Sequence, residues 1–228
     1  MFFAISFLPR LLVGSAVVTN LIDAQNLRHD LSAVGQTFDI TAPVIAQLFP
    51  NKGLLLLGDR HGVCEFANTT TVTGGIIKCG DIVRVCGTFR PAPATPEPLW
   101  ADCESVEILS HGPPPRPRPI STLDFLRGTC DQCLSELKGT VKDVFRDELD
   151  TLFTFLVLLS DNETIYAPVR FAGPAPLWQD YPPIGSEVSL VGVPMQKSPL
   201  NRRHLGRYFI VHDPTSIQIL TPAPADSF

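Results

Sequence analysis

Apolar and polar residues alternate along several stretches of the chain. Val188 and Leu190 fall on one side of an extended segment and Ser189 on the other, and residues 163–169 alternate in the same way. Alternation bounded by turn residues predicts strands with one buried face. The expected strands are 36–49, 53–58, 62–67, 81–90 and 99–109 in the first half of the chain, and 134–146, 151–160, 163–169, 186–196 and 206–220 in the second half.

The two halves repeat one another. Residues 80–87 and 185–192 both read Gly-x-x-Val-x-x-x-Gly, and further landmarks follow in the same order. A repeat of this length predicts two copies of one folded unit. The other matching landmarks are 105–109 with 216–220, 38–44 with 136–141, and two short helical leads at 21–31 and 120–126.

A proline-rich run separates the copies. Residues 111–119 favour extended polyproline geometry, which makes a semi-rigid spacer. The domains expected from this division are an apolar N-terminal segment (1–19), a first domain (20–110), the linker (111–119), a second domain (120–221) and a C-terminal tail (222–228).

Five strands per copy, with a turn-rich or helical piece between the third and fourth (71–77 and 175–181), are typical of an OB-like barrel. The 22 Pro and 16 Gly residues argue against long helices. Gly87 and Gly139, inside strand text, suggest bulges or barrel bends. The predicted fold class is therefore all-β with short helices, a tandem of two five-stranded OB-like β-barrels, and a small β-sandwich is the alternative.

Composition changes this picture in two ways. The formal net charge of −5 makes nucleic acid an unlikely partner for the chain as a whole, although a local basic patch remains compatible with it. The first 18 residues are apolar apart from Pro9 and Arg10. They are interpreted as an export signal, a packed N-terminal segment or a misplaced start, and no membrane span is expected in 20–228.

Cys130 and Cys133 form a C-x-x-C motif just before a strand. A loop disulfide or an ordinary turn is expected there. The pair is a weak candidate for metal, because no second cysteine pair has matching spacing, or for redox chemistry. The other four cysteines, which include three in strand-like text, are expected to act as small buried hydrophobes. No catalytic motif and no cofactor site is identified, so the chain is not expected to be an enzyme.

The candidate binding site lies on the second copy. OB folds bind ligands on the face of strands two and three, between the loops that join strands one to two and four to five. Aromatic residues on that face and cations around it would suit sugars, nucleotides or single-stranded nucleic acid. Alternatively, the phenylalanines belong to the barrel core and the arginines only solvate a loop. The candidate residues are Phe153, Phe155, Tyr166, Arg170, Arg202, Arg203, His204 and Arg207.

The second copy resembles an OB-like module from the extracytoplasmic sensory regions of bacterial hybrid sensor histidine kinases. Residues 120–126, 137–147 and 155–161 carry the resemblance, and 184–192, 205–207 and 216–220 continue it. The resemblance implies a non-catalytic, extracytoplasmic sensory module that passes ligand occupancy to signalling domains in the same or a neighbouring polypeptide. The kinase domain of that family is absent from this chain.

Three functions follow from these observations. The main hypothesis is a sensory or interaction module for a small molecule, glycan or protein partner. The first alternative is an OB-fold protein that binds single-stranded nucleic acid through its second copy. The second alternative is a structural or assembly component of the cell envelope.

Overall fold

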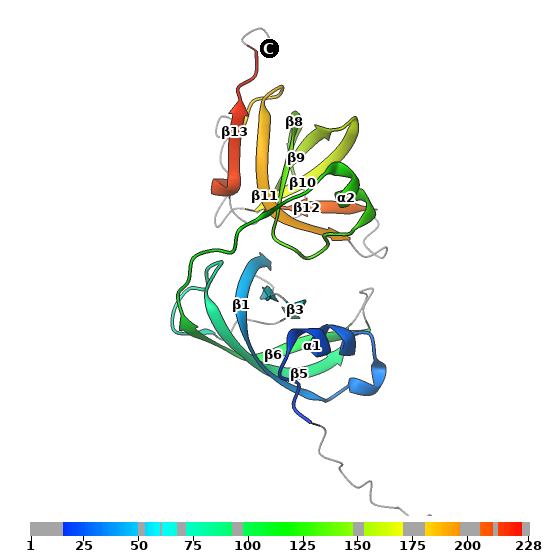
Figure 1. The fold of residues 1–228 in the computed structure, drawn as a ribbon, viewed down its shortest axis with the longest axis vertical. Coiled ribbons are helices and arrows are strands. Elements are labelled where there is room, and N and C mark those ends of the chain that lie inside the picture. Colours follow the sequence, from blue (N-terminus) through cyan, green and yellow to red (C-terminus); the bar gives the residue numbers. More distant parts are fainter. Residues whose placement is uncertain are drawn as a thin grey trace, which may run out of the picture.

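The structure, a computed structural model, describes residues 16–49, 53–59, 61–67, 72–92, 98–147, 153–170, 181–196, 206–211 and 214–224. It contains two antiparallel-rich sheets, one in each half of the chain (Figure 1). The first half contains α1 (Leu21–Leu27), β1 (Thr37–Phe49), β2 (Leu54–Gly58), β3 (Val63–Ala67), β4 (Val72–Thr73), β5 (Ile82–Pro91) and β6 (Leu99–Ser110). The second half contains β7 (Arg118–Pro119), α2 (Thr122–Arg127), β8 (Ser135–Arg146), β9 (Phe153–Ser160), β10 (Glu163–Arg170), β11 (Glu187–Gln196), β12 (Arg207–Ile210) and β13 (Ile217–Thr221).

Each sheet closes on itself. In the first sheet the strand order is β3-β2-β1-β5-β6-β4, and a parallel pairing of β3 with β6 closes the barrel. In the second sheet β10 pairs in parallel with β12, and β8 pairs with β11 to complete the ring. Both rings have the five-strand order of an OB fold, so the predicted fold class is confirmed and the β-sandwich alternative is wrong.

The duplication is visible in the strand register. Val83 of β5 pairs with Ile108, and Val188 of β11 pairs with Ile219, so the sequence landmarks occupy equivalent positions. The glycine that opens each landmark, Gly80 or Gly185, has a positive φ of 95° or 93°. This backbone conformation favours glycine because it has no Cβ.

The hydrogen bonds around these two glycines also match. Gly80 donates its backbone N–H to the carbonyl of Val44 at 2.9 Å, and Gly185 donates to the carbonyl of Val141 at 2.8 Å. Val44 and Val141 are therefore equivalent, as the sequence landmarks predict.

A short helix precedes the first strand of each barrel and contributes to its core. Leu21 and Ala24 of α1 are buried in the first core, and Phe125 of α2 is buried in the second. The helix α2 begins with a capping box in which Ser121 and Asp124 exchange hydrogen bonds between side chains and backbone. The predicted helical leads are thus present, although α1 ends at Leu27 and a 3-10 turn follows at Leu31–Ala33.

Several details differ from the sequence predictions. The last strand of the second barrel is divided into β12 and β13 by a 3-10 turn at Pro214–Ser216. The end of the proline run forms β7, which pairs with β8. The predicted piece at 71–77 contains β4, which pairs with β6, whereas 175–180 lie outside the described residues.

A bulge is present at one of the two glycines for which the sequence predicts a bulge or a barrel bend. The register shifts between Cys86 and Gly87, but there is no shift at Gly139 in the pairing of β8 with β11. A Cβ at Gly139 would lie 3.0 Å from the carbonyl oxygen of Leu159, so this glycine allows a close approach of strands instead.

The two barrels pack against each other through an apolar cluster, which we call the inter-barrel cluster. Aliphatic residues on the outer face of the first barrel meet aromatic and aliphatic residues of the second. Its buried members are Ile45, Ala46 and Leu56 from the first barrel and Leu134, Phe155, Val193, Tyr208 and Ile210 from the second. No helix in the described part of the chain has the length and hydropathy needed to cross a membrane.

Candidate functional site on the second barrel

The predicted phenylalanines point away from the barrel core. Leu156 and Leu158 of β9 belong to the second core, so Phe153 and Phe155, which alternate with them, lie on the outer face. Thr154 is also buried on the inner side, where its hydroxyl accepts a hydrogen bond from the hydroxyl of Tyr181 at 2.7 Å. The phenylalanines therefore do not belong to the interior of the second barrel, although both are buried, Phe153 at 6 % and Phe155 at 2 % exposure.

Their outward orientation does not leave them open to solvent. Phe155 is only 2 % exposed, because it is a member of the inter-barrel cluster. The first barrel uses Leu56 of β2 for the same contact, with Val63 of β3 packed against the cluster. In both barrels, part of the face that OB folds use for ligands thus contributes to packing between the barrels.

A strip of aromatic rings continues from Phe155 toward solvent on both sides; we call Phe145, Phe155, Tyr208 and Tyr166 the aromatic strip. Phe145 stacks on Phe155 with centroids 5.1 Å apart and planes 9° apart, and Phe155 meets Tyr208 edge-on at 6.3 Å. Tyr166 pairs with Tyr208 between β10 and β12. The end members are open, Phe145 at 38 % and Tyr166 at 44 % exposure.

Burial sets the chemistry at the middle of the strip. Tyr208 is 4 % exposed, and its burial, with the nearby Tyr166, raises its pKa to about 12. Its hydroxyl therefore stays neutral through the physiological pH range.

Sequence reasoning missed Phe145. Strict alternation from the inward Val141 would place residue 145 inside the barrel. The register of β8 against β9 shifts between Val141 and Asp143, so Val144 packs toward the core and Phe145 turns outward. The nearest sequence signal is Gly139, where the sequence predicts a bulge or a barrel bend, whereas the register shift lies between Val141 and Asp143.

The predicted cations are only partly located. Arg170 ends β10, where its backbone pairs with Phe153; its side chain lies outside the described residues, as do Arg202, Arg203 and His204. Arg207 opens β12, and its guanidinium forms an ion pair with Asp131. Of the predicted rim, Arg207 is thus held by a carboxylate that the sequence did not single out.

Asp131 lies inside the C-x-x-C motif. Cys130 and Cys133 are free thiols at the two ends of one turn, closed by a hydrogen bond from the backbone N–H of Cys133 to the carbonyl of Cys130 at 3.2 Å. Gln132 adopts a positive φ of 62° and donates to the carbonyl of Pro194 on β11 at 2.8 Å. The turn therefore fixes both ends of the β11–β12 loop, through Pro194 before the loop and Arg207 after it.

The hydrogen bonds of the motif confirm the predicted turn. Burial raises the pKa of the Cys133 thiol, which disfavours the thiolate that zinc requires. Among the described residues, no three His, Cys, Asp or Glu side chains gather in a way that could hold a metal ion.

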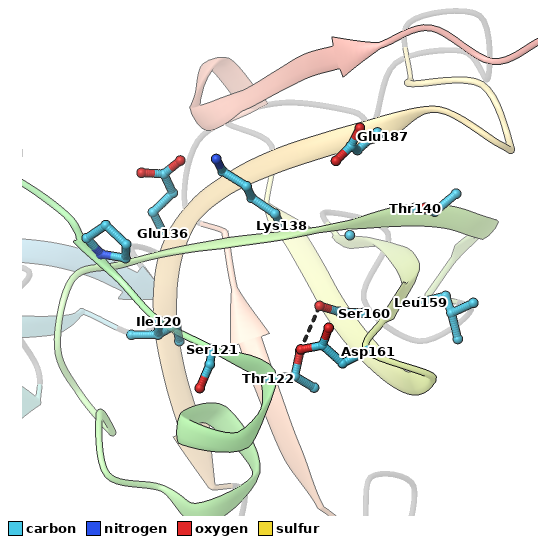
Figure 2. A pocket seen from close by; sticks show the side chains of 12 residues that line it. Ile120, Ser121, Thr122, Glu136, Lys138, Thr140, Leu159, Ser160, Asp161 and Glu187 are labelled. Atoms are coloured by element: carbon cyan, nitrogen blue, oxygen red, sulfur yellow. Dashed lines mark hydrogen bonds between the residues drawn. The ribbon is translucent and has the colours of Figure 1, made fainter.

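The second barrel also has a groove of about 470 Å³ beside α2 (Figure 2). Glu136, Lys138 and Glu187 form its upper row in this view, and Thr122, Ser160 and Asp161 form its lower row. The hydroxyls of Thr122 and Ser160 are 2.8 Å apart and hydrogen-bonded, which ties α2 to the β9–β10 turn. No sequence pattern indicates this groove, because its residues come from α2, from separate strands and from the β9–β10 turn.

Comparisons with known proteins give structural likenesses only. No protein-family model matches the chain, and no curated protein matches it. Among solved structures, the chain is similar to the one described as "Crystal structure of the tetrameric p202 HIN2", with 10 % identity, a TM-score of 0.32, and coverage of 80 % of this chain and 92 % of that one.

Proposed function

We propose that the protein is a non-catalytic OB-fold binding module whose second barrel holds a single-stranded nucleic acid against the open rings of Phe145 and Tyr166. The single observation that carries this proposal is the aromatic strip, which runs along the outer face of the second barrel and is exposed at both ends. OB folds bind oligonucleotides on this face.

The spacing of the two open rings suits a short run of nucleotides. Phe145 is on β8 and Tyr166 on β10, with β9 between them. Neighbouring strands are about 4.8 Å apart, so the two rings are separated by roughly 10 Å across the sheet, and Tyr166 lies two residues further along the strands than Phe145. A base stacked on each ring would then mark the two ends of the contact.

Charge limits the strength of this binding. The chain carries a net charge of −5, so long-range attraction to phosphates must come from local cations. Arg146 follows Phe145, Arg170 ends β10, and Arg202 and Arg203 precede β12 in the sequence. We therefore expect weak binding that depends strongly on salt, with stacking as the main source of affinity.

Fluorescence anisotropy on the full chain with a labelled 12-nucleotide DNA or RNA tests the proposal. We expect binding at 20 mM salt that weakens sharply at 200 mM. Tyr166→Ala and Phe145→Ala should each weaken it by roughly 5- to 100-fold, since stacking is worth about 1–3 kcal/mol per base. Leu123→Ala, at an exposed position of α2, is the matched control and should bind as the parent does.

Two outcomes contradict the proposal: no binding at 20 mM salt, or binding that neither aromatic substitution weakens. The sensory role and the extracytoplasmic location implied by the family resemblance stay predictions. An absence of oligonucleotide binding would favour the sensory role over the present proposal.

A further inference from the structure

The duplication allows a position-by-position comparison of the outer surfaces of the two barrels. Val83 pairs with Ala42 in the first barrel, and Val188 pairs with Gly139 in the second. Counting along the strands from these pairs makes Arg84 equivalent to Ser189, and Asp39 equivalent to Glu136. Each equivalent pair lies on adjacent strands and faces outward.

In the first barrel this place is filled by an ion pair. The guanidinium of Arg84 donates two hydrogen bonds to the carboxylate of Asp39, from Nε at 2.8 Å and from Nη2 at 2.5 Å. This two-pronged contact matches the planar geometry of guanidinium and carboxylate. The first barrel thus shows which chemical group fits a carboxylate at this position of the fold.

In the second barrel the carboxylate is kept and the arginine is missing. The carboxylate oxygen Oε1 of Glu136 accepts a hydrogen bond from the hydroxyl of Ser189 at 2.7 Å. Among the described residues, no hydrogen bond to its other carboxylate oxygen is present. Glu136 lines the groove of Figure 2, whereas Ser189 is 4 % exposed and is not among the residues that line it.

The charges around the groove favour a cation. Three carboxylates line it, those of Glu136, Asp161 and Glu187, against the single ammonium of Lys138. Glu187 accepts a hydrogen bond from the hydroxyl of Thr221 at 3.1 Å, which orients its carboxylate beside the groove. The volume of about 470 Å³ lies within the range of roughly 300–1,000 Å³ seen for small-molecule sites.

We propose that this groove binds a ligand that bears a guanidinium group, which takes over the place that Arg84 fills in the first barrel. The carboxylate of Glu136 accepts two hydrogen bonds from the guanidinium. Asp161, Ser160 and the rest of the lower row face the remainder of the ligand. Lys138 opposes the cation and keeps the affinity modest. The site shares no residue with the aromatic strip, so it stands whether or not the protein binds nucleic acid.

Titration of the full chain, followed by backbone amide NMR, tests the proposal with two matched probe pairs. The first pair is L-arginine and its uncharged isostere L-citrulline. The second pair is the same two residues inside a glycine-flanked tripeptide. We expect the charged member of at least one pair to shift amides of β8 and β11 saturably, and both citrulline compounds to shift none. Free arginine alone would indicate a small-molecule ligand, and the peptide alone would indicate an arginine side chain of a partner.

Three substitutions connect the binding to the residues. Glu136→Gln should weaken arginine binding at least tenfold, and Ser189→Arg should abolish it by supplying the arginine of the first barrel from within the chain. Lys138→Gln should strengthen binding severalfold, because it removes the opposing charge. Asp39→Asn, the equivalent change in the first barrel, is the control and should leave binding unchanged.

Equal shifts with arginine and citrulline, or full binding by the Ser189→Arg variant, would overturn the proposal. The Lys138→Gln result protects against a folding artefact, because a variant that binds more tightly is a folded one.

Discussion

The two barrels share one set of strand pairings and differ in what covers their outer surfaces. In the first barrel the carboxylate of Asp39 is covered by Arg84, and β4 pairs alongside β6. In the second barrel the equivalent carboxylate of Glu136 faces an open groove, and the aromatic strip ends in exposed rings. The carboxylate of Asp39 is thus paired within the first barrel, whereas Glu136 lines a groove on the second.

This difference shows which positions a duplicated fold can change. The inward valines Val83 and Val188, and the positive-φ glycines Gly80 and Gly185, have the same pairing in both copies, as closure of the ring requires. Outward residues have no such constraint. Replacing an arginine by serine at one outward position costs the fold little, because an exposed ion pair adds little stability.

The barrels also meet through unequal surfaces. The first barrel contributes aliphatic side chains to the inter-barrel cluster, and the second contributes two aromatic ones, Phe155 and Tyr208. Aromatic side chains bury a large area and keep few rotamers, which makes them effective anchors of an interface. Phe155 therefore couples the two barrels more than any single aliphatic member does.

The largest expected effect comes from breaking that coupling. Phe155→Ala should lower the free energy of unfolding by about 3–5 kcal/mol, the usual cost of removing a buried phenylalanine. Because the lost contacts lie between the barrels, the parent should unfold in one calorimetric transition and the variant in two. Differential scanning calorimetry of the full chain measures both quantities.

Tyr166→Ala is the matched control for Phe155→Ala. It removes an aromatic ring from the same outer face, but that ring is largely exposed, so the change should cost no more than about 0.5 kcal/mol and leave a single transition. A single transition in the Phe155→Ala variant as well would show that the barrels are coupled through other contacts.

The strands and their order could be predicted from the sequence because they depend on local alternation and on turn residues. The repeat strengthened that prediction, since an error in one copy would have shown as a mismatch with the other. The position of Phe145 could not be predicted, because it depends on a register shift between β8 and β9 that only the neighbouring strand determines.

The candidate site was predicted in part. The outward orientation of Phe155 follows from alternation, but its burial depends on where the first barrel docks, which no local pattern records. The groove joins residues of α2, β8, β9 and β11 that are far apart in the chain. The replacement of Arg84 by Ser189 was present in the aligned repeat, yet it had no meaning until the register placed Asp39 and Glu136 beside them.

A smaller effect concerns the pH dependence of the free energy of unfolding, which should differ between the two barrels. The buried carboxylate of Asp81 accepts hydrogen bonds from the backbone N–H of Lys78 at 2.8 Å and from Nδ1 of His111 at 2.9 Å. Burial alone would raise the pKa of Asp81, but these bonds outweigh it and hold the pKa below its usual value. The equivalent Ser186 accepts from the backbone of Ala223 at 3.2 Å and carries no charge.

The lowered pKa of Asp81 in the folded state sets the direction in which stability changes with pH. The stabilisation by Asp81 is fully present above the unfolded pKa of about 3.9 and is lost as the pH falls through the folded pKa below it. Asp81→Asn should cost about 1–3 kcal/mol at pH 7 and progressively less as the pH falls below about 3.9, in urea unfolding followed at pH 7 and at low pH. Ser186→Ala should cost the same at both, and a pH-independent loss in Asp81→Asn would contradict the assignment.

The smallest expected effect concerns the ion pair that distinguishes the two outer surfaces. The guanidinium of Arg84 hydrogen-bonds the carboxylate of Asp39 and holds the pKa of Asp39 below its usual value. Both side chains are exposed, so Arg84→Ser should shift the melting temperature barely at physiological salt and slightly more at low salt. Since the folded pKa is the lower one, that shift should be present at pH 7 and vanish as the pH falls well below 4.

Thr41→Ala, at the exposed residue paired with Arg84, is the control and should show no salt dependence. A large, salt-independent loss in Arg84→Ser would mean that the arginine is needed for closure of the first barrel, and the second barrel would then need another explanation for tolerating serine at this position.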